Sequence, residues 1–354
     1  MPQNDRQTPL ATPSPKPSQR RLIFRLSSLG DVVMAMSSLE VPGSKVDWVV
    51  SEEWAELLQG HPRIERVWTF NRKQGFMAWV ALCRILWAEG YSEVLDLHRS
   101  LRTRLAFFLF RWWDLTGLCR SAPRSRWKNA PKQRWRVWGY FCFKGLWPRA
   151  FRPESRVSLA AKVAGGSGKE RPSLAYVLRR PRSAVLPTQQ GPYLCVMPSS
   201  HWPGKQWPAS SYFQLLKGGR ALPIVLGMPN DANSRELSTL FESAGVKSRS
   251  LIGKLSLVDV CHLLAGSDGY VGSDTGIAHL AQALGKHSVV LFGPTATDGG
   301  FGPWSPSAVG VERKLWCRPC SKDGRACFRA RANKYICLRD LSPAEVHAKA
   351  SWIR

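Results

Sequence analysis

The most informative short stretch of the chain runs from residue 270 to 295 and reads YVGSDTGIAHLAQALGKHSVVLFGPT. An apolar run ends here in Ser-Asp-Thr-Gly, and a helical pattern follows. Helix N-termini carry unsatisfied N–H groups and attract negative charge, so this turn could bind a phosphate, with Gly276 allowing close backbone approach. Asp274 could instead be only an N-cap. His279 lies one helical turn after Thr275, on the same face of the expected helix. It could bind a ligand there, or it could have only a structural role.

Two other loops place a charged residue just after an apolar run. Ser27-Ser-Leu-Gly-Asp31 precedes a helical pattern, and a carboxylate near a helix N-terminus keeps a low pKa. Such a group suits a general base that accepts a proton only as the transition state forms; helix capping is the alternative for Asp31. The loop 198–208, PSSHWPGKQWP, contains Lys205. This lysine could neutralise a phosphate, or it could be an ordinary solvated side chain.

Two widespread nucleotide-binding patterns do not occur at any expected junction between a strand and a helix. These are GxGxxG and GxxxxGK[ST], which mark dinucleotide-binding folds and P-loop enzymes. The sequence therefore argues against a dinucleotide-dependent oxidoreductase and against a P-loop nucleotide hydrolase.

The bulk composition limits the class of protein. A length of 354 residues with 44% hydrophobic residues suggests two domains with real cores. The first 20 residues are polar and rich in proline, which predicts a disordered leader rather than a signal peptide, and no apolar run is long enough to span a membrane. A formal charge of +26 indicates an anionic partner, and a nucleic acid, an anionic membrane or a phosphorylated substrate would each fit.

Alternating strand and helix patterns predict two α/β domains with parallel sheets. In the first domain, residues 21–180, we expect strands at 21–26, 45–50, 66–70 and 94–97 and helices at 32–39, 54–58, 76–89 and 101–112. After a linker at 181–192, the second domain, residues 193–354, should have strands at 193–197, 223–226, 248–251, 269–272 and 288–292 and helices near 209–217, 231–244, 257–265 and 276–284. Ligands should bind where strands end at their carboxyl edge, in a cleft between the domains.

The segment 111–152 breaks this alternation. It contains eleven basic residues, one acid and six Trp. Tryptophan favours the membrane interface and basic residues bind anionic lipid, so the segment suits a membrane surface. The same composition also binds single-stranded nucleic acid, although no RNA-binding or helix-turn-helix motif accompanies it.

Four stretches in order resemble glycosyltransferase family 9, the ADP-heptose:lipopolysaccharide heptosyltransferases. They are RLSSLGDVVMA, the loop around Lys205, LIGKLSLVDVCHLLAGSDG and the stretch 270–295. The resemblance implies a GT-B fold, in which two Rossmann-like domains face a cleft. It also implies inverting, metal-independent transfer of heptose from ADP-heptose to the inner core of lipopolysaccharide, without a cofactor, by a cytoplasmic enzyme peripheral to the inner membrane.

The resemblance also assigns roles to individual residues. Asp31 matches the base that deprotonates the acceptor, and Lys205 matches the lysine that stabilises the departing diphosphate. The implied donor-binding residues are Ser199, Ser200, Asp231, Glu236, Asp274, Thr275, Gly276 and His279. The implied acceptor-binding residues are Ser27, Ser28, His98, Arg99 and Arg102. Two departures lie in the acceptor domain: Ser37 replaces the family's usual proline and His98 its usual glutamine.

Four of the nine cysteines cluster near the C-terminus, at Cys317, Cys320, Cys327 and Cys337. A C-x2-C pair followed by two more cysteines resembles a structural zinc site, but the later spacing is not a second C-x2-C pair. We expect reduced structural thiols and no metal, with a metal site as the alternative. The family resemblance associates such a tail with the heptosyltransferase II-like type.

Two alternatives to the main functional interpretation stay open. One is a family relative that uses another nucleotide sugar or another acceptor. The other is a non-catalytic basic scaffold that binds nucleic acid or an anionic membrane surface. The presence of both Asp31 and Lys205 argues against a relative without activity.

Overall fold

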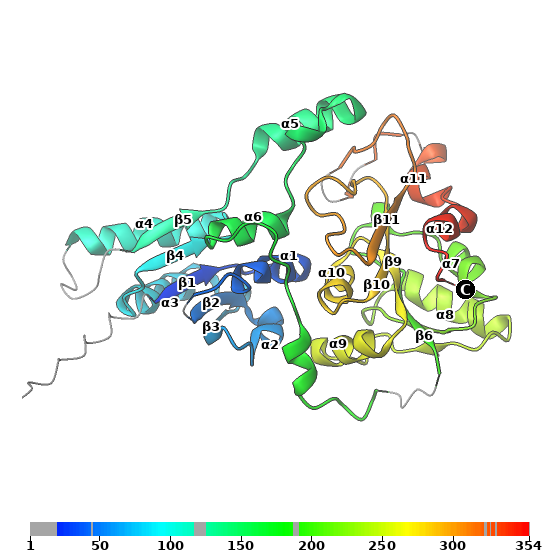
Figure 1. Cartoon of the computed structure of the whole chain (residues 1–354), viewed down its shortest axis with the longest axis horizontal. Coiled ribbons are helices and arrows are strands. Elements are labelled where there is room, and N and C mark those ends of the chain that lie inside the picture. The colour runs from blue at the N-terminus through cyan, green and yellow to red at the C-terminus, as the bar shows by residue number, and fades with distance from the viewer. Residues whose placement is uncertain are drawn as a thin grey trace, which may run out of the picture.

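The computed structural model describes residues 20–43, 45–116, 125–186, 191–321, 324–325, 327–329 and 331–353. It consists of two α/β halves that lie side by side, each built on a parallel sheet (Figure 1). The predicted disordered leader lies outside these residues, except for Arg20. Within the described part of the chain, no helix is both long and apolar enough to cross a membrane.

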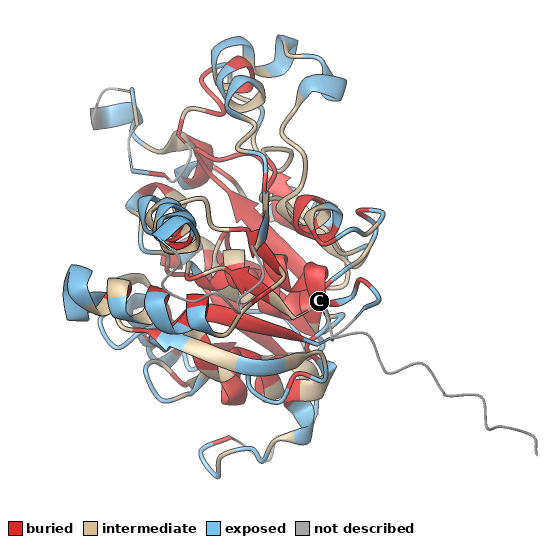
Figure 2. Cartoon of the chain, turned by 90° about the vertical axis from the view of Figure 1, so that its left-hand side faces the viewer, coloured by how far each residue is buried: buried red, intermediate tan, exposed pale blue. Residues whose placement is uncertain are grey.

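The first half contains a five-stranded sheet in the order β3-β2-β1-β4-β5. Its strands are β1 (Arg21–Phe24), β2 (Val46–Ser51), β3 (Ile64–Phe70), β4 (Glu93–Asp96) and β5 (Arg126–Asn129). Its helices are α1 (Leu29–Ala35), α2 (Ala55–Leu58), α3 (Gly75–Ala88), α4 (Leu101–Thr116), α5 (Arg134–Phe143) and α6 (Arg156–Val163). The central strands β1 and β2 are buried on both faces, as expected of a parallel sheet covered by helices (Figure 2).

The second half contains a six-stranded sheet in the order β11-β10-β9-β6-β7-β8. Its strands are β6 (Tyr193–Met197), β7 (Leu222–Val225), β8 (Arg249–Ser250), β9 (Gly269–Ser273), β10 (His287–Phe292) and β11 (Ala308–Glu312). Its helices are α7 (Ala209–Leu216), α8 (Ala232–Ser243), α9 (Leu257–Gly266), α10 (Gly276–Ala283), α11 (Ile336–Arg339) and α12 (Pro343–Lys349). All its strand pairs are parallel, so the predicted α/β class is confirmed.

The two halves meet through helices α1 and α10, which pack against each other. The contact is close: a Cβ added to Gly276 would lie 2.8 Å from Cβ of Leu29. One hydrophobic cluster includes Val32 and Leu29 from the first half and Ala278 and Leu280 from the second. Because both helices follow the carboxyl end of a strand, this packing brings two predicted site loops together.

The expected strands and helices are present, with ends shifted by a few residues. In the segment 111–152, which breaks the predicted alternation, no strand or helix was predicted beyond residue 112, but it contains β5 and α5. Helix α6, which packs on α1, was also not predicted, and neither were β11, α11 and α12. Helix α5 projects from the first half at the top of the molecule, and two short 3-10 helices follow it before α6 (Figure 1). The domain and linker boundaries given above stay predictions.

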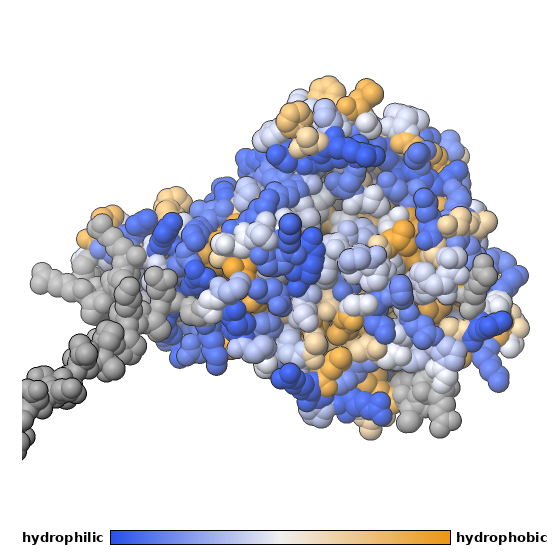
Figure 3. All heavy atoms as spheres, in the orientation of Figure 1, coloured by the Kyte–Doolittle hydropathy of each residue, from blue (hydrophilic) through white to orange (hydrophobic). Residues whose placement is uncertain are grey.

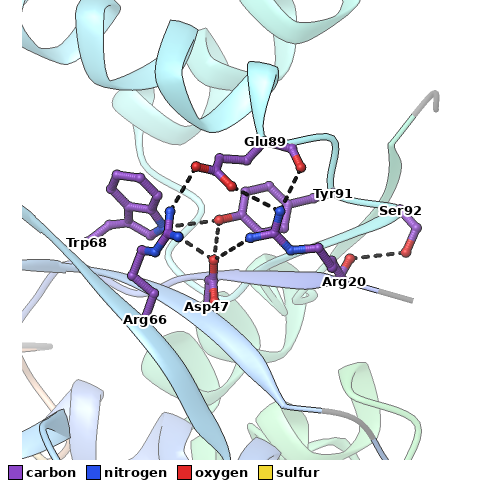
Figure 4. A network of polar contacts seen from close by, with 7 residues as sticks. All are labelled: Arg20, Asp47, Arg66, Trp68, Glu89, Tyr91 and Ser92. Atoms are coloured by element: carbon purple, nitrogen blue, oxygen red, sulfur yellow. Dashed lines mark hydrogen bonds and ion pairs between the residues drawn. The ribbon is translucent and has the colours of Figure 1, made fainter. Parts of the chain in front are cut away.

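A closed polar network lies at the amino ends of strands β1 to β4 (Figure 4). The buried carboxylate of Asp47 accepts hydrogen bonds from the hydroxyl of Tyr91 and, at 3.4 Å, from Trp68 Nε1, and it pairs with Arg20 at 3.4 Å. Glu89 binds Arg20 at 2.9 Å and a second arginine, Arg66, at 2.8 Å. Although burial opposes it, these two guanidinium groups lower the pKa of Glu89.

Candidate functional site

Two cavities adjoin one another in the cleft between the two halves. The smaller, of about 350 Å³, is lined by the N-terminal ends of α1 and α10 and by Lys205. The larger, of about 820 Å³, lies between the carboxyl ends of β1 and β4 and helix α5. Asp31, Arg156 and Phe141 line both cavities. The carboxyl ends of parallel strands thus provide a site between the two halves, where the sequence predicted it.

Asp31 lies in the first turn of α1 and borders both cavities. Its carboxylate forms an ion pair with Arg25 and accepts hydrogen bonds from Ser28, from the backbone N–H at 3.2 Å and from Oγ at 3.1 Å. Burial opposes ionisation, but Arg25 and these hydrogen bonds outweigh it, so the pKa of Asp31 is lowered. The carboxyl group therefore caps its helix and is also ionised at neutral pH, facing open space.

Arg156, at the start of α6, is a neighbour of Asp31 that was not predicted. It lines both cavities. Burial lowers its pKa, while the negative charge of Asp31 acts in the opposite direction and Arg25 adds to the lowering. Asp31 is thus paired with Arg25 and also feels the charge of a second cation, Arg156, from a distant part of the chain.

Lys205 and Asp274 form the polar wall of the smaller cavity on the side of the second half. Lys205 Nζ lies 2.6 Å from Asp274 Oδ2, and the hydroxyl of Thr295 donates to the same oxygen at 3.1 Å. Lys205 is therefore not an ordinary solvated loop residue, since its side chain is only 15% exposed. The pair places a cation beside the N-terminus of α10, where an anion is favoured.

The start of α10 is open to the smaller cavity. Thr275 is its N-cap residue and Gly276 its first residue, and both line the cavity. No hydrogen bond from the Thr275 side chain caps this helix. Asp274 also does not serve as the N-cap, because it binds Lys205 instead. The backbone N–H groups of this turn can therefore bind an anion in the cavity.

His279 lies one turn further along α10 and is buried at the same cavity, with 5% of its surface exposed. Its Nδ1 accepts a hydrogen bond from Trp304 Nε1 at 3.2 Å. Burial lowers the pKa of His279, although the carboxylates of Asp274 and Asp31 act in the opposite direction. The ring is therefore neutral at pH 7.

The other predicted donor-binding residues lie outside the lining of both cavities. Ser199 is buried, and its hydroxyl lies 2.8 Å from that of Ser234, while Ser200 binds Gln206 through its carbonyl oxygen. Asp231 precedes α8 and accepts a hydrogen bond from the N–H of Met228 at 2.7 Å. Glu236 is exposed on α8. The cavities thus gather the residues predicted for the phosphate end, and roles for the remaining four stay predictions.

The predicted acceptor-binding residues divide in a similar way. His98 and Arg99 line the larger cavity and Ser28 lines the smaller. Ser27 accepts a hydrogen bond from Arg72. Arg102 lies outside both linings, with its guanidinium 5.7 Å from the centroid of the Phe70 ring. Their roles in acceptor binding stay predictions.

Several residues of the larger cavity were not singled out in the sequence, and most are basic. Its described lining contains five cations, at Arg25, Arg99, Lys132, Arg134 and Arg156, and one carboxylate, Asp31. The pKa of Lys132 is lowered by burial and by the neighbouring positive charges of Arg104, Arg134 and Arg99. Cations held together in this way favour the binding of an anion. Of these five, Arg99 was predicted, and the excess of arginine and lysine in the segment 111–152 was the only sequence signal for Lys132 and Arg134.

The four C-terminal cysteines are all free thiols, and Cys320 lines the larger cavity. Burial raises the pKa of Cys320 to about 11, and the other three cysteines act in the same direction. Among the residues that the structure describes, no group of three or more His, Cys, Asp or Glu side chains has a geometry suited to a metal ion.

Comparison with known sequences points to one family. The model of glycosyltransferase family 9 (heptosyltransferase) matches residues 154–327. Lipopolysaccharide heptosyltransferase 1 of Pseudomonas aeruginosa is 27% identical over 92% of this chain and 96% of its own length, and that of Escherichia coli K12 is 28% identical over 80% and 91%. Lipopolysaccharide heptosyltransferase 2 of E. coli K12 is 29% identical over 27% of this chain and 29% of its own length.

Solved structures agree on the fold. A glycosyl transferase family 9 protein from Veillonella parvula superimposes with a TM-score of 0.67 and 17% identity, covering 95% of this chain and 97% of the other. The E. coli heptosyltransferase WaaC, solved with ADP, superimposes with a TM-score of 0.64 and 21% identity. The match covers 93% of this chain and 98% of WaaC. The two Rossmann-like halves around a cleft are thus the GT-B arrangement, and that prediction is confirmed.

Proposed function

This chain belongs to glycosyltransferase family 9, and on that premise we propose that it transfers heptose from ADP-heptose to the inner core of lipopolysaccharide. The observation that carries the proposal is the position of Asp31, an ionised carboxylate at the border of two cavities. One cavity offers an anion site at the N-terminus of α10, and the other is strongly basic. A donor and an acceptor can therefore meet at a single base.

The reaction we propose is a single inverting displacement. Asp31 takes the proton of an acceptor hydroxyl as that oxygen attacks the anomeric carbon of the heptose. The bond from this carbon to the diphosphate oxygen breaks, and ADP leaves with the electron pair. The low pKa of Asp31 keeps it ionised before the attack.

Lys205 and the N–H groups of α10 would stabilise the negative charge that develops on the departing diphosphate. In the structure Lys205 is bound to Asp274 at 2.6 Å. A diphosphate that enters the cavity would compete for this lysine, and Asp274 would then be available for a hydroxyl of the sugar. In this mechanism protein groups supply the positive charge, and no metal ion or cofactor is needed.

The larger cavity would hold the acceptor. Its cations, Lys132 and Arg134 among them, fit an acceptor that carries acidic groups close to the reacting hydroxyl. The curated relatives that match most of this chain are called heptosyltransferase 1, whereas the matches called heptosyltransferase 2 are shorter. We therefore favour a type 1 acceptor over the type II-like one that the C-terminal cysteines indicated.

We further propose that the enzyme is cytoplasmic and peripheral on the inner face of the inner membrane, with α5 and the chain after it as the contact. Five apolar side chains there are exposed: Trp135, Trp138, Phe143, Leu146 and Phe151. Basic residues lie beside them, and Figure 3 shows hydrophobic and hydrophilic atoms intermixed over this region at the top of the molecule. Exposed aromatic side chains favour the membrane interface, and basic residues bind anionic lipid. Binding through this region would place the larger cavity near a membrane-bound acceptor. Nucleic acid is the less favoured partner.

The proposal is tested by calorimetric titration of the protein with ADP, UDP and GDP, and then of Lys205→Ala with ADP. We expect ADP to bind more tightly than the other two nucleotides and the variant to lose most of this affinity. A preference for UDP or GDP would indicate a relative with another sugar donor. If no nucleotide binds, the basic scaffold is the better interpretation, and retention of nucleic acid or anionic vesicles would then identify its partner.

A further inference from the structure

The contact between Trp304 and His279 has no part in the mechanism above, yet one of its two residues, His279, lines the smaller cavity, where we place the donor. Trp304 belongs to the loop between β10 and β11, and His279 to α10. The indole Nε1–H points at His279 Nδ1 at 3.2 Å. An indole nitrogen can only donate, so Nδ1 must accept with its lone pair.

The hydrogen bond therefore determines where the imidazole proton lies. Burial keeps the ring neutral by lowering the pKa of His279. A neutral ring has one N–H, and because Nδ1 accepts, the proton must be on Nε2. Among the described residues, Nδ1 is bonded to Trp304, and no hydrogen-bond partner of Nε2 is present.

The Nε2 edge of the ring faces the first half of the molecule, across the cleft. A Cβ built on Gly30 would lie 2.7 Å from His279 Cδ2 and 3.5 Å from Nε2. Gly30 directly precedes Asp31, and all three residues line the smaller cavity together with Lys205. The N–H is thus presented where the base and the phosphate-binding lysine also converge.

We propose that Trp304 is a positioning residue that holds His279 as a neutral Nε2–H donor, and that this N–H binds an oxygen of the nucleotide-sugar donor. The inference rests on the proposed function and deepens it by assigning a tautomer and the residue that sets it. The oxygen belongs to the diphosphate or to the transferred sugar, both of which offer acceptors. A neutral donor can bind either one without placing a second cation beside Lys205.

The first test measures the tautomer in the protein without substrate. In ¹⁵N spectra of histidine-labelled protein near pH 7, the wild type should show His279, assigned by comparison with His279→Gln, as a neutral ring protonated on Nε2. Trp304→Phe keeps an aromatic ring but removes the N–H, so the proton should redistribute between the nitrogens and the ring should titrate at higher pH. Trp352→Phe is the matched control, because Trp352 also lies beside a histidine, His287, with ring centroids 5.5 Å apart.

The second test measures binding of ADP and of ADP-heptose by calorimetry, with unfolding temperatures recorded for every variant. Trp304→Phe should weaken binding by about 3- to 10-fold, the loss expected for one hydrogen bond, and Trp352→Phe should not. His279→Gln keeps an N–H near the Nε2 position and should bind better than His279→Asn, which does not. Weaker binding of both ligands would place the oxygen on the diphosphate, and weaker binding of ADP-heptose alone would place it on the sugar.

The two proposals fail in different ways. If the wild-type ring is charged or protonated on Nδ1, or if Trp304→Phe changes neither tautomer nor affinity, the inference about Trp304 is overturned while the family function stands. If wild-type protein binds no nucleotide, the proposed function fails, and with it the role given to the Nε2–H, whatever the spectra show.

Discussion

Two polar clusters lie at opposite ends of the first sheet, and they differ in how their charges are satisfied. At the amino ends of the strands, Asp47 and Glu89 are each bound by several donors from neighbouring elements (Figure 4). At the carboxyl ends, Asp31 borders two cavities, and Lys132 and Arg134 face open space among other cations. The first cluster is closed, whereas the second has charge left to offer a ligand.

The difference teaches how to separate structural from functional polar residues in one domain. Groups whose donors and acceptors are matched within the fold gain nothing from a ligand, and their removal leaves buried partners unsatisfied. Groups held close to like charges and open to a cavity gain from a ligand of opposite charge, because it relieves the repulsion between them. Substitutions at the two ends should therefore act on different quantities.

The largest effect is expected for Asp31→Asn, which removes the proposed base. We expect kcat to fall by about 10²- to 10⁴-fold, the usual contribution of a general base, while ADP still binds with nearly wild-type affinity. The measurement is steady-state transfer from ADP-heptose, with calorimetric ADP binding as the control. Transfer by the variant at the wild-type rate would show that another group takes the proton.

Asp47→Asn at the closed end should lower stability and leave kcat unchanged, the opposite of Asp31→Asn. The amide retains the shape of the side chain and can keep an oxygen towards Tyr91, Trp68 and Arg20, which all donate to the same oxygen of Asp47, but it loses the negative charge that pairs with Arg20. The free energy of unfolding should fall by about 1–3 kcal/mol. Denaturant titration checks this, and kcat of the folded variant should stay unchanged. A fall in kcat without loss of stability would contradict the division into a structural cluster at the amino ends of the strands and a functional cluster at their carboxyl ends.

A smaller effect is expected when two cations of the open end are removed together. The double variant Lys132→Gln, Arg134→Gln should raise the KM for an acidic acceptor by about 3- to 10-fold and leave ADP binding unchanged, since these charges line only the larger cavity and act mainly on the acceptor. The matched control is Arg126→Gln, Arg249→Gln, which removes the same total charge from exposed positions outside both cavity linings. An equal rise in KM for both pairs would mean that net charge, not the cavity, attracts the acceptor.

The sequence predicted the elements that pack on the core better than those that do not. Strands such as β6 and β9 are buried along their whole length and read as apolar runs between turns. In contrast, β5 is half exposed and α5 carries exposed tryptophans, so neither shows a clear period in its hydrophobic residues. Strand β5 is held by its pairing with β4 and by Trp127 at the edge of the core, and α5 lines the two cavities.

Local sequence patterns also predicted only part of the site. They identified Asp31, Lys205 and the turn before α10, because each follows a strand and stands in a family motif. Arg156 and Trp304 were not identified, because they reach Asp31 and His279 from the start of α6 and from a long loop. Such partners depend on how α1, α6 and α10 pack, which no local pattern records.

The smallest effect concerns the pH dependence of the open end and tests why Asp31 is ionised there. Arg25 pairs with Asp31 and lowers its pKa against the effect of burial. Since transfer requires the ionised carboxylate, wild-type activity should be lost only as the pH falls below the usual range of an aspartate. Arg25→Gln removes the cation, so the pKa of Asp31 should rise and the acid limb of the kcat/KM profile should move to higher pH. Lys128→Gln is the control, because it removes a cation paired with Glu93 at 2.7 Å on the same sheet but outside both cavities. If the acid limb of Arg25→Gln stays at the wild-type pH, the limb does not report ionisation of Asp31. The ion pair with Arg25 would then not determine the protonation state of the base.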